Sequence, residues 1–316
     1  MNFHRKIIAL GFIVFGFCHS LLAQSSAPAS LAYVLQADSL AKTKAEAVAK
    51  LAACGRDWIV LDASFSTDEP WTAADLATIR AGKIGRKVIS YLSIGEAEDY
   101  RAYWNPAWDA KHDGKPDAGA PAWLLGQNPE WKGNYRVKYW NADWQAIILN
   151  VEDQIIATGF DGVYLDIVDG FETFEQDGKN FIDNRINLET GQSYRRDMVD
   201  WVKTVAVHAH TTNSAALVIP QNGVQLLVNT DFVAAIDAVG VEDLFANGDK
   251  LQKPADSQYV LDFLTPFATA GKPVLDIEYA KRKPIQMRVR ASAAQNGFVW
   301  LVTDRQLKTL GESGTK

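Results

Sequence analysis

Eight short apolar runs, rich in β-branched and aromatic residues, recur along this 316-residue chain and constrain its fold more than any other feature. The runs cover residues 31–36, 58–64, 87–94, 159–166, 216–222, 237–242, 273–278 and 298–303. Most are continuously apolar, as strands buried on both faces of a parallel sheet are. Helix-like stretches lie between many of them, at residues 39–53, 72–81, 144–158, 193–210, 256–270 and 284–295. The alternation predicts an α/β fold in the form of a (β/α)8 TIM barrel.

An open, doubly wound sheet is the alternative interpretation of the same alternation. Sheets of that kind usually carry a glycine-rich phosphate loop, GxGxxG or GxxxxGK, after one of their strands. Neither motif follows any of the eight runs in this sequence, which favours the barrel.

A long insertion rich in tryptophan, proline and glycine follows the third predicted strand, at residues 96–141. Six of the ten tryptophans of the chain lie between residues 104 and 144. Loops of this length are uncommon and usually functional. Because aromatic faces stack on flat apolar surfaces, including those of sugar rings, we expect one or two of these tryptophans, with Trp140 as the candidate, to line a cleft. The others are expected to anchor the insertion to the barrel.

The N-terminal segment has the layout of a secretory signal peptide. A basic start at residues 4–6 precedes an apolar run at residues 7–17, and the small residue Ala23 follows. The run is shorter than the roughly 20 residues that cross a bilayer, so an uncleaved anchor is the less favoured alternative. We therefore expect a signal peptide at residues 1–23, a flexible leader at 24–30, a single domain at 31–310 and a frayed tail. The mature protein is expected in the periplasm or outside the cell, without a stable membrane span.

Composition excludes several classes of protein. With 47% hydrophobic and 22% charged residues the chain is not disordered, and a net charge of −6 argues against a nucleic-acid partner. Cleavage of the signal peptide would remove Cys18 and leave Cys54 alone, which excludes an internal disulfide and a cysteine metal site. We expect no cofactor and no metal, although a carboxylate site formed by Asp62, Asp276 and Glu278 is an alternative.

Polar side chains gather where the predicted strands end. If the last inward-facing residues of each strand are taken, the C-terminal mouth of the barrel receives Asp62, Tyr91, Ser93, Tyr164, Asp166, Asn222, Glu242, Asp276 and Glu278. Barrel enzymes place their sites at this end. Asp166 and Glu242 each close a buried apolar run, and two carboxyl groups across one mouth suit glycoside hydrolysis. In that reaction one carboxyl group attacks or activates water while the other protonates the leaving oxygen.

Three runs carry a resemblance to a known family: residues 91–100 (YLSIGEAEDY), 134–140 (NYRVKYW) and 159–166 (GFDGVYLD). Together they resemble glycoside hydrolase family 114, whose members are described as endo-α-1,4-polygalactosaminidases. The similarity extends from about residue 31 to residue 303. It implies a TIM barrel that acts on galactosamine-containing polysaccharide, with Asp166 as the nucleophile and Glu242 as the matching acid/base.

From these observations we expect a secreted, endo-acting and retaining glycosidase for α-1,4-linked galactosamine polymers. Sugar hydroxyl groups and amines would be bound by Asp62, Tyr91, Ser93, Glu96, Tyr164, Asn222, Glu278 and Trp140. Acidic residues at the mouth, Asp169 and Glu98 among them, would attract a cationic glycan, and the attraction would weaken at high salt. Two alternatives remain: an exported barrel that binds a glycan without cutting it, and a glycosidase for another α-linked polymer.

Overall fold

Eight parallel strands form the centre of the fold, and each lies within one of the runs that the sequence predicts. The computed structural model describes residues 27–316, so the predicted signal peptide lies outside the described residues. The strands are β1 (Leu31–Val34), β2 (Trp58–Leu61), β5 (Lys87–Ser93), β9 (Gly162–Asp166), β12 (Leu217–Pro220), β13 (Val239–Glu242), β16 (Val274–Glu278) and β17 (Val299–Val302).

The parallel strands follow one another in chain order across two sheets. One sheet has the order β1-β2-β5-β9-β12 and the other begins β13-β16-β17, while a parallel bridge between Gln221 and Gly240 connects β12 to β13. β1 lies beside β17, so the first and the last of the eight parallel strands also approach each other. The side chains enclosed by the strands form their own apolar cluster, which includes Tyr33, Val60, Ile89, Ile219 and Leu301. The molecule is therefore an α/β fold built around parallel sheets.

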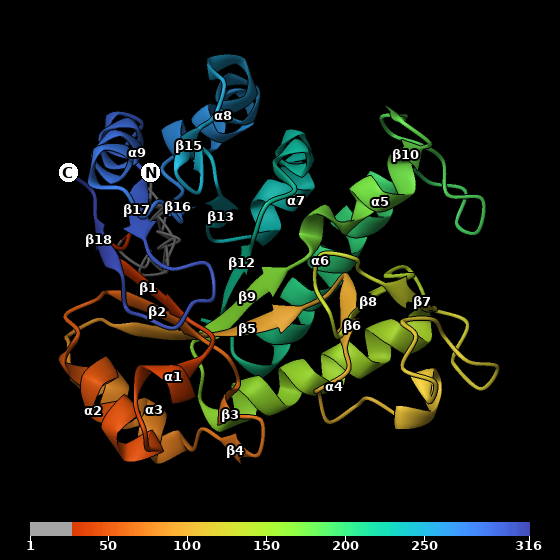
Figure 1. Cartoon of the computed structure of the whole chain (residues 1–316), viewed down its shortest axis with the longest axis horizontal. Coiled ribbons are helices and arrows are strands. Elements are labelled where there is room, and N and C mark those ends of the chain that lie inside the picture. The colour runs from red at the N-terminus through yellow and green to blue at the C-terminus, as the bar shows by residue number, and fades with distance from the viewer. Residues whose placement is uncertain (1–26) are drawn as a thin grey trace, which may run out of the picture.

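Most of the helices pack outside the strands that follow them in the chain. The longer ones are α2 (Lys44–Ala53), α3 (Ala73–Ala81), α4 (Ala142–Thr158), α6 (Tyr194–Thr212), α8 (Pro254–Thr269) and α9 (Lys283–Gln295). α3 contacts β5, α4 contacts β9, α6 contacts β12, α8 contacts β16 and α9 contacts β17 (Figure 1). Within residues 27–316 none of the helices combines the length and apolar character that a bilayer span requires.

The helix expected at residues 39–53 is two helices, α1 (Ala37–Leu40) and α2. The break falls where the Thr43 side chain accepts a hydrogen bond from the amide of Glu46 and starts a new helix. At α3 the Thr72 and Asp75 side chains form a reciprocal capping box. The shorter elements are α5 (Phe171–Glu175), α7 (Thr230–Ala235), η1 (Pro106–Asp109), η2 (Val168–Gly170) and η3 (Val224–Val228).

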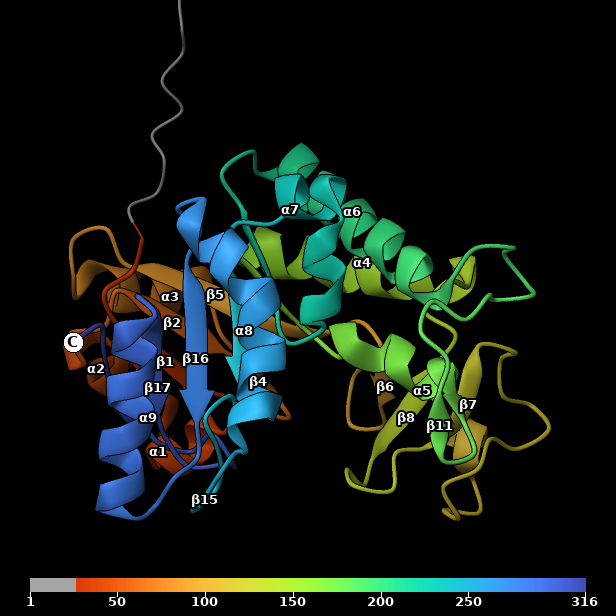
Figure 2. The same ribbon diagram turned by 90° about the horizontal axis from the view of Figure 1, so that it is seen from above.

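The segment between β5 and α4 forms a small antiparallel sheet in the order β6-β8-β7, with β6 (Glu96–Glu98), β7 (Leu124–Gln127) and β8 (Asn134–Val137). Figure 1 shows this sheet beyond the arrowhead of β5, and Figure 2 places it at the end of the molecule away from α9. Trp104, Trp108, Trp123 and Trp144 pack in a chain with ring centroids 5.0–5.2 Å apart. The indole of Trp144 also donates to the carbonyl of Ile94 at 2.9 Å, which anchors the segment to the end of β5.

Three hairpins complete the strands: β3 (Ser64–Ser66) with β4 (Glu69–Pro70), β10 (Gln176–Asp177) with β11 (Asn180–Phe181), and β14 (Ala246–Asn247) with β15 (Lys250–Leu251). The C-terminal tail, expected to be frayed beyond residue 310, instead forms β18 (Glu312–Gly314). This strand pairs antiparallel with β17, because the free edge of β17 offers backbone groups to it. At the other end, Ser30 of the expected leader donates to Asp57, so this residue is attached to the body of the fold.

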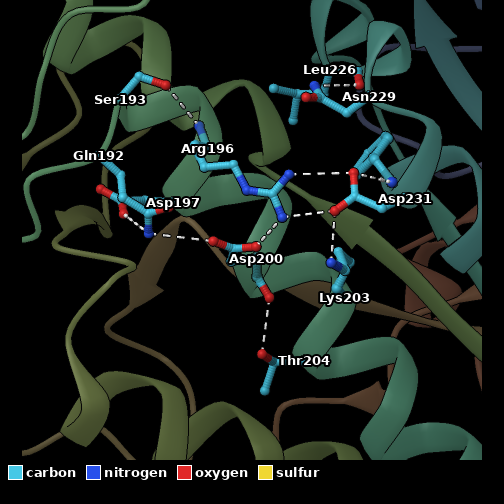
Figure 3. A network of polar contacts seen from close by, with 11 residues as sticks. Gln192, Ser193, Arg196, Asp197, Asp200, Lys203, Thr204, Leu226, Asn229 and Asp231 are labelled. Atoms are coloured by element: carbon cyan, nitrogen blue, oxygen red, sulfur yellow. Dashed lines mark hydrogen bonds and ion pairs between the residues drawn. The ribbon is translucent and has the colours of Figure 1, made fainter.

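An ion-pair network on the outside joins α6 to α7 (Figure 3). The Arg196 guanidinium and the Lys203 ammonium both contact Asp231, at 2.7 Å each, and Arg196 also pairs with Asp200. These hydrogen bonds and ion pairs lower the pKa of Asp231. The network attaches α7 to the much longer α6, and the chain after α7 leads directly into β13.

Candidate active site

A cleft of about 720 Å3 lies where the parallel strands end. Both predicted catalytic carboxyl groups, Asp166 and Glu242, line it. Seven acidic and four basic residues contribute to its lining, so the cleft has an acidic excess. Tyr33, Tyr91 and Tyr279 contribute their rings from β1, β5 and the end of β16.

Asp166 is the last residue of β9 and is held by three donors. Its Oδ2 accepts a hydrogen bond from the Tyr91 hydroxyl at 2.8 Å, and its Oδ1 accepts from the Ile167 amide at 2.8 Å. The Gln221 amide donates to Oδ1 at 3.4 Å. Ile167 has a φ of 58°, an unfavourable value for a β-branched residue, and this turn points its amide at the carboxylate. Burial raises the pKa of Asp166, whereas the hydrogen bonds from Tyr91 and Ile167 oppose the rise.

Glu242 is the last residue of β13 and lies in a different environment. Its amide donates to Oδ1 of Asn222 at 3.1 Å, and its carboxylate accepts a hydrogen bond from the Tyr279 hydroxyl. Burial and then the charge of Asp166 raise the pKa of Glu242 to about 7. At neutral pH a large part of the Glu242 population therefore carries a proton, which a general acid needs.

The floor below the two carboxyl groups is made by Tyr164 and Gly240. Tyr164 is 0% exposed and packs against Tyr33 with ring centroids 5.1 Å apart. A Cβ atom at Gly240 would lie 1.8 Å from the Tyr164 hydroxyl oxygen, so only glycine fits there. Tyr164 was predicted to bind substrate, and this prediction is wrong, because the residue is sealed under the cleft rather than exposed in it.

Asp62 lines the cleft as predicted, but both of its oxygens are already engaged. The Arg101 guanidinium bonds to Asp62 with two nitrogens, at 2.7 and 2.9 Å, and reaches Glu98 with a third at 2.5 Å. Glu98 also accepts from the Tyr100 hydroxyl at 2.6 Å. This pairing argues against the expectation that Asp62 holds a substrate amine.

Glu96 and Asn222 line the cleft, while Ser93 supports it from behind. Glu96 is buried, accepts from the side-chain amide of Asn128 at 2.8 Å, and has its pKa raised by that burial. The Ser93 hydroxyl donates to the carbonyl of Glu96 at 2.9 Å. Ser93 lines an adjoining cavity of about 550 Å3 that shares Asp62, Tyr91 and Arg101 with the cleft.

Two predicted binding residues lie away from the cleft. Glu278 faces outward from β16, where its carboxylate accepts from the amides of Phe245 at 2.6 Å and Ala246 at 3.2 Å. The side chains of Leu275 and Ile277 point inward from this strand, so the prediction assigned the wrong face of β16 to the cleft. Asp276 is likewise on the outer face, and with Glu278 it cannot share a metal ion with Asp62. Within residues 27–316 no group of three histidine, cysteine or acidic side chains is placed to hold a metal.

Trp140 is the second predicted binding residue that lies away from the cleft. Its ring packs against Tyr139, Phe174 and Tyr194 with centroids 4.9–5.3 Å apart, and its indole donates to Glu189 at 2.8 Å. The tryptophan that lines the cleft is Trp131, which is 52% exposed. The expectation that one or two tryptophans reach the cleft therefore holds for a different residue.

The sequence analysis did not identify four of the cleft residues: Tyr33, Arg101, Gln221 and Tyr279. Gln221 and Tyr279 each adjoin a residue that was chosen, and the opposite strand parity would have found both of them. Tyr33 has the inward parity of the first strand, which the prediction left out. Asp169, which the sequence analysis does place at the mouth, lines the cleft one helical turn after Asp166, and burial followed by the charge of Asp166 raises its pKa. Arg101 had no signal in the sequence, because its partners are set by the small sheet around β6.

Parallel strands that end at a cleft with two carboxyl groups in different environments form an arrangement typical of glycoside hydrolases. The sequence model of glycoside hydrolase family GH114 matches residues 23–316, which is nearly the whole chain. The chain belongs to this family.

One relative is similar to this chain in sequence, and two solved structures are similar to it in fold. An uncharacterized protein of Deinococcus radiodurans is 36% identical over 255 residues, which cover 80% of this chain and 74% of that protein. The glycoside hydrolase domain of PelA from Pseudomonas aeruginosa superposes with a TM-score of 0.62 at 21% identity, over 92% of this chain and 100% of that one. Aspergillus fumigatus Ega3, solved in complex with galactosamine, gives a TM-score of 0.64 at 19% identity, over 92% and 96%. These two likenesses support the fold.

Proposed function

We propose that this protein is an exported, endo-acting glycoside hydrolase that cleaves α-1,4-linked galactosamine-containing polysaccharide with net retention. We also propose that the two parallel sheets act as one (β/α)8 barrel that carries the long insertion after β5. The observation that carries the proposal is the presence of Asp166 and Glu242 in one cleft with unlike surroundings.

In the first step the Asp166 carboxylate attacks the anomeric carbon, and the bond to the leaving oxygen breaks. Glu242 gives its proton to that oxygen, so the departing chain leaves as a neutral alcohol. The product on the enzyme is a glycosyl ester of Asp166. In the second step Glu242 removes a proton from water, the water attacks the anomeric carbon, and Asp166 is released as a carboxylate.

The surroundings of the two groups support this division of roles. Tyr91 and the Ile167 amide donate hydrogen bonds to Asp166, which favour its charged form. Glu242, with its pKa raised to about 7, holds the proton when Asp166 is charged. Two nearby carboxyl groups with separated pKa values are the usual basis of acid and nucleophile assignments.

The substrate assignment rests on charge and on likeness. A polymer with free amines is cationic, and the acidic excess of the cleft would concentrate it. The galactosamine in the Ega3 structure belongs to that protein, and it motivates the choice of sugar here. Export is proposed from the basic and apolar pattern of residues 1–23.

Release of reducing ends from partly deacetylated α-1,4-galactosaminan tests this function. The wild type, Asp166→Asn and Glu242→Gln are compared, with Asp153→Asn, an exposed position on α4, as the matched control. We expect release by the wild type and the control and a loss of at least about 100-fold in the other two. Neutral and acidic α-linked polysaccharides are included as further substrates.

Each alternative has its own signature in this assay. Release from another α-linked polymer alone would contradict the galactosaminan assignment and keep the glycosidase. Binding of the polymer by the wild type and Asp166→Asn alike, without release by either, would identify a binding protein and contradict the proposal.

A further inference from the structure

A chain of polar contacts links Arg101 to Asp166 through the side chains of Glu98 and Tyr91. Arg101 bonds to Oε2 of Glu98 at 2.5 Å. Oε1 of Glu98 lies 3.2 Å from the Tyr91 hydroxyl, which lies 2.8 Å from Oδ2 of Asp166. Tyr91 has one hydroxyl hydrogen, so it donates fully to only one of the two carboxylates.

Glu98 is well supplied with donors that do not involve Tyr91. Its Oε2 is occupied by Arg101 and its Oε1 accepts from the Tyr100 hydroxyl at 2.6 Å. The guanidinium also lies 5.0 Å from the Tyr100 ring centroid and 5.8 Å from that of Tyr91, which holds all three side chains together. Because Glu98 is satisfied, the Tyr91 hydrogen is left for Asp166.

We propose that Arg101 is a positioning residue: its ion pair with Glu98 directs the Tyr91 hydroxyl hydrogen to Asp166 and neutralises the Glu98 charge beside it. The proposal rests on the proposed role of Asp166 as nucleophile. Arg101 acts through its neighbours and has no contact with Asp166 of its own.

Neutralising the Glu98 charge is important because the other groups that face Asp166 are either acidic or uncharged. They are Tyr33 of β1, Tyr91 of β5, Glu96 and Glu98 of β6, Tyr164 of β9, Asp169 of η2, Gln221 after β12 and Glu242 of β13. This set contains four carboxyl groups and no positively charged side chain. Burial raises the pKa of Asp166 and the charge of Glu98 raises it further, while the Tyr91 hydrogen bond lowers it.

Loss of Arg101 would therefore raise the pKa of Asp166 in two ways. The unpaired Glu98 charge would repel Asp166, and Glu98 would draw the Tyr91 hydrogen away from it. A like charge at this range shifts a carboxyl pKa by roughly one unit or more. We expect Arg101→Met to raise the pKa of Asp166 by about one unit.

Carboxyl 13C NMR of protein labelled at aspartate Cγ measures this pKa directly, and Asp166→Asn identifies the resonance. The variants are Arg101→Met, Glu98→Gln and the double variant Arg101→Met/Glu98→Gln. Arg80→Met is the control, because Arg80 pairs with Asp161 at 3.0 Å, just before β9 and at the opposite end of that strand from Asp166. We expect the double variant to return the pKa of Asp166 to its wild-type value and the control to leave it unchanged.

An unchanged Asp166 pKa in Arg101→Met, or a raised pKa that Glu98→Gln fails to reverse, would overturn the proposal. If Arg101→Met does not fold, Tyr100→Phe removes one donor of Glu98 at a half-exposed position, and a smaller rise of the same sign is expected. The NMR titration needs no turnover, so inactivity on galactosaminan would strike the proposed function and not this result. On an active enzyme, the acidic limb of the kcat/KM profile should move by the same amount as the pKa.

Discussion

The hydroxyl group of Tyr279 donates a hydrogen bond to the carboxylate of Glu242. The contact joins the ends of β13 and β16, which pair in parallel. A hydrogen bond to a carboxylate favours its charged form, so Tyr279 limits how far burial and Asp166 raise the pKa of Glu242.

The basic limb of the pH–rate profile follows from this contact. A general acid must be protonated, so kcat/KM should fall as the pH rises through the Glu242 pKa of about 7. Tyr279→Phe removes a group that lowers this pKa, and the basic limb should move to higher pH by up to about one unit. A limb that stays in place, or moves to lower pH, would contradict the assignment of Glu242 as the acid.

Gly240→Ala should lower both the stability of the protein and its activity, because Gly240 lies under the cleft. The added Cβ would lie 1.8 Å from the hydroxyl oxygen of the fully buried Tyr164. Overpacking of this kind costs about 1–3 kcal/mol of unfolding free energy, and Glu242, two residues on, would be displaced with it. Urea unfolding and kcat/KM measure the two effects. Gly119→Ala, where a Cβ meets no atom within 4 Å, should change neither, and equal behaviour of the two variants would refute the close-contact argument.

Asp276 should destabilise the protein increasingly as the pH rises. It is 0% exposed on the outer face of β16, and neither carboxyl oxygen has a hydrogen-bond partner among the described residues. Burial, and then Glu278, raise its pKa in the folded state well above the unfolded value. The stability of the neutral form is therefore fully present below the unfolded pKa and is lost as the pH rises toward the folded pKa.

Asp276→Asn removes this titration. Its advantage over the wild type should grow with pH by at most about 1.4 kcal/mol per unit, as measured by urea unfolding between pH 5 and pH 8. Asp262→Asn, exposed on α8, serves as the control. An advantage that is constant with pH would show that Asp276 does not titrate in this way.

Asp231→Asn should weaken the junction of α6 and α7. Asp231 pairs with Arg196 and Lys203, yet it is 41% exposed, so the loss should be about 1 kcal/mol or less. Because its folded pKa is lowered, the contribution is present above the unfolded pKa and disappears as the pH falls through the folded pKa. Urea unfolding at pH 7 in low and high salt measures it. A difference that is insensitive to salt would contradict an ionic origin.

The strands were predictable because their apolar runs are short, continuous and separated by helical stretches. The face of each strand was harder to predict, because a parallel strand buried on both sides shows no alternation of apolar and polar residues. β16 illustrates this: Asp276 and Glu278 are buried on its outer face, while Ile277 and Tyr279 point inward. An acidic residue at a strand end is expected to face the mouth, but the Glu278 carboxylate instead accepts hydrogen bonds from the amides of Phe245 and Ala246.

The catalytic candidates and their supports differ in the same respect. Asp166 and Glu242 could be located from the sequence because each ends a buried strand that points into the cleft. Arg101 and Trp131 lie in the segment between β5 and α4, whose path depends on the packing of the small sheet and its tryptophans. No local pattern records contacts of that kind.

The central claim is that Asp166 forms a covalent bond to the sugar, while Glu242 protonates the leaving oxygen and then removes a proton from water. An aryl α-galactosaminide with a good leaving group needs little acid help in the first step, whereas the second step still needs a base. Glu242→Gln should therefore accumulate a glycosyl adduct after rapid quenching, and peptide mass spectrometry should place it on Asp166. Release of the aryl group without any adduct, or an adduct on another residue, would contradict the account.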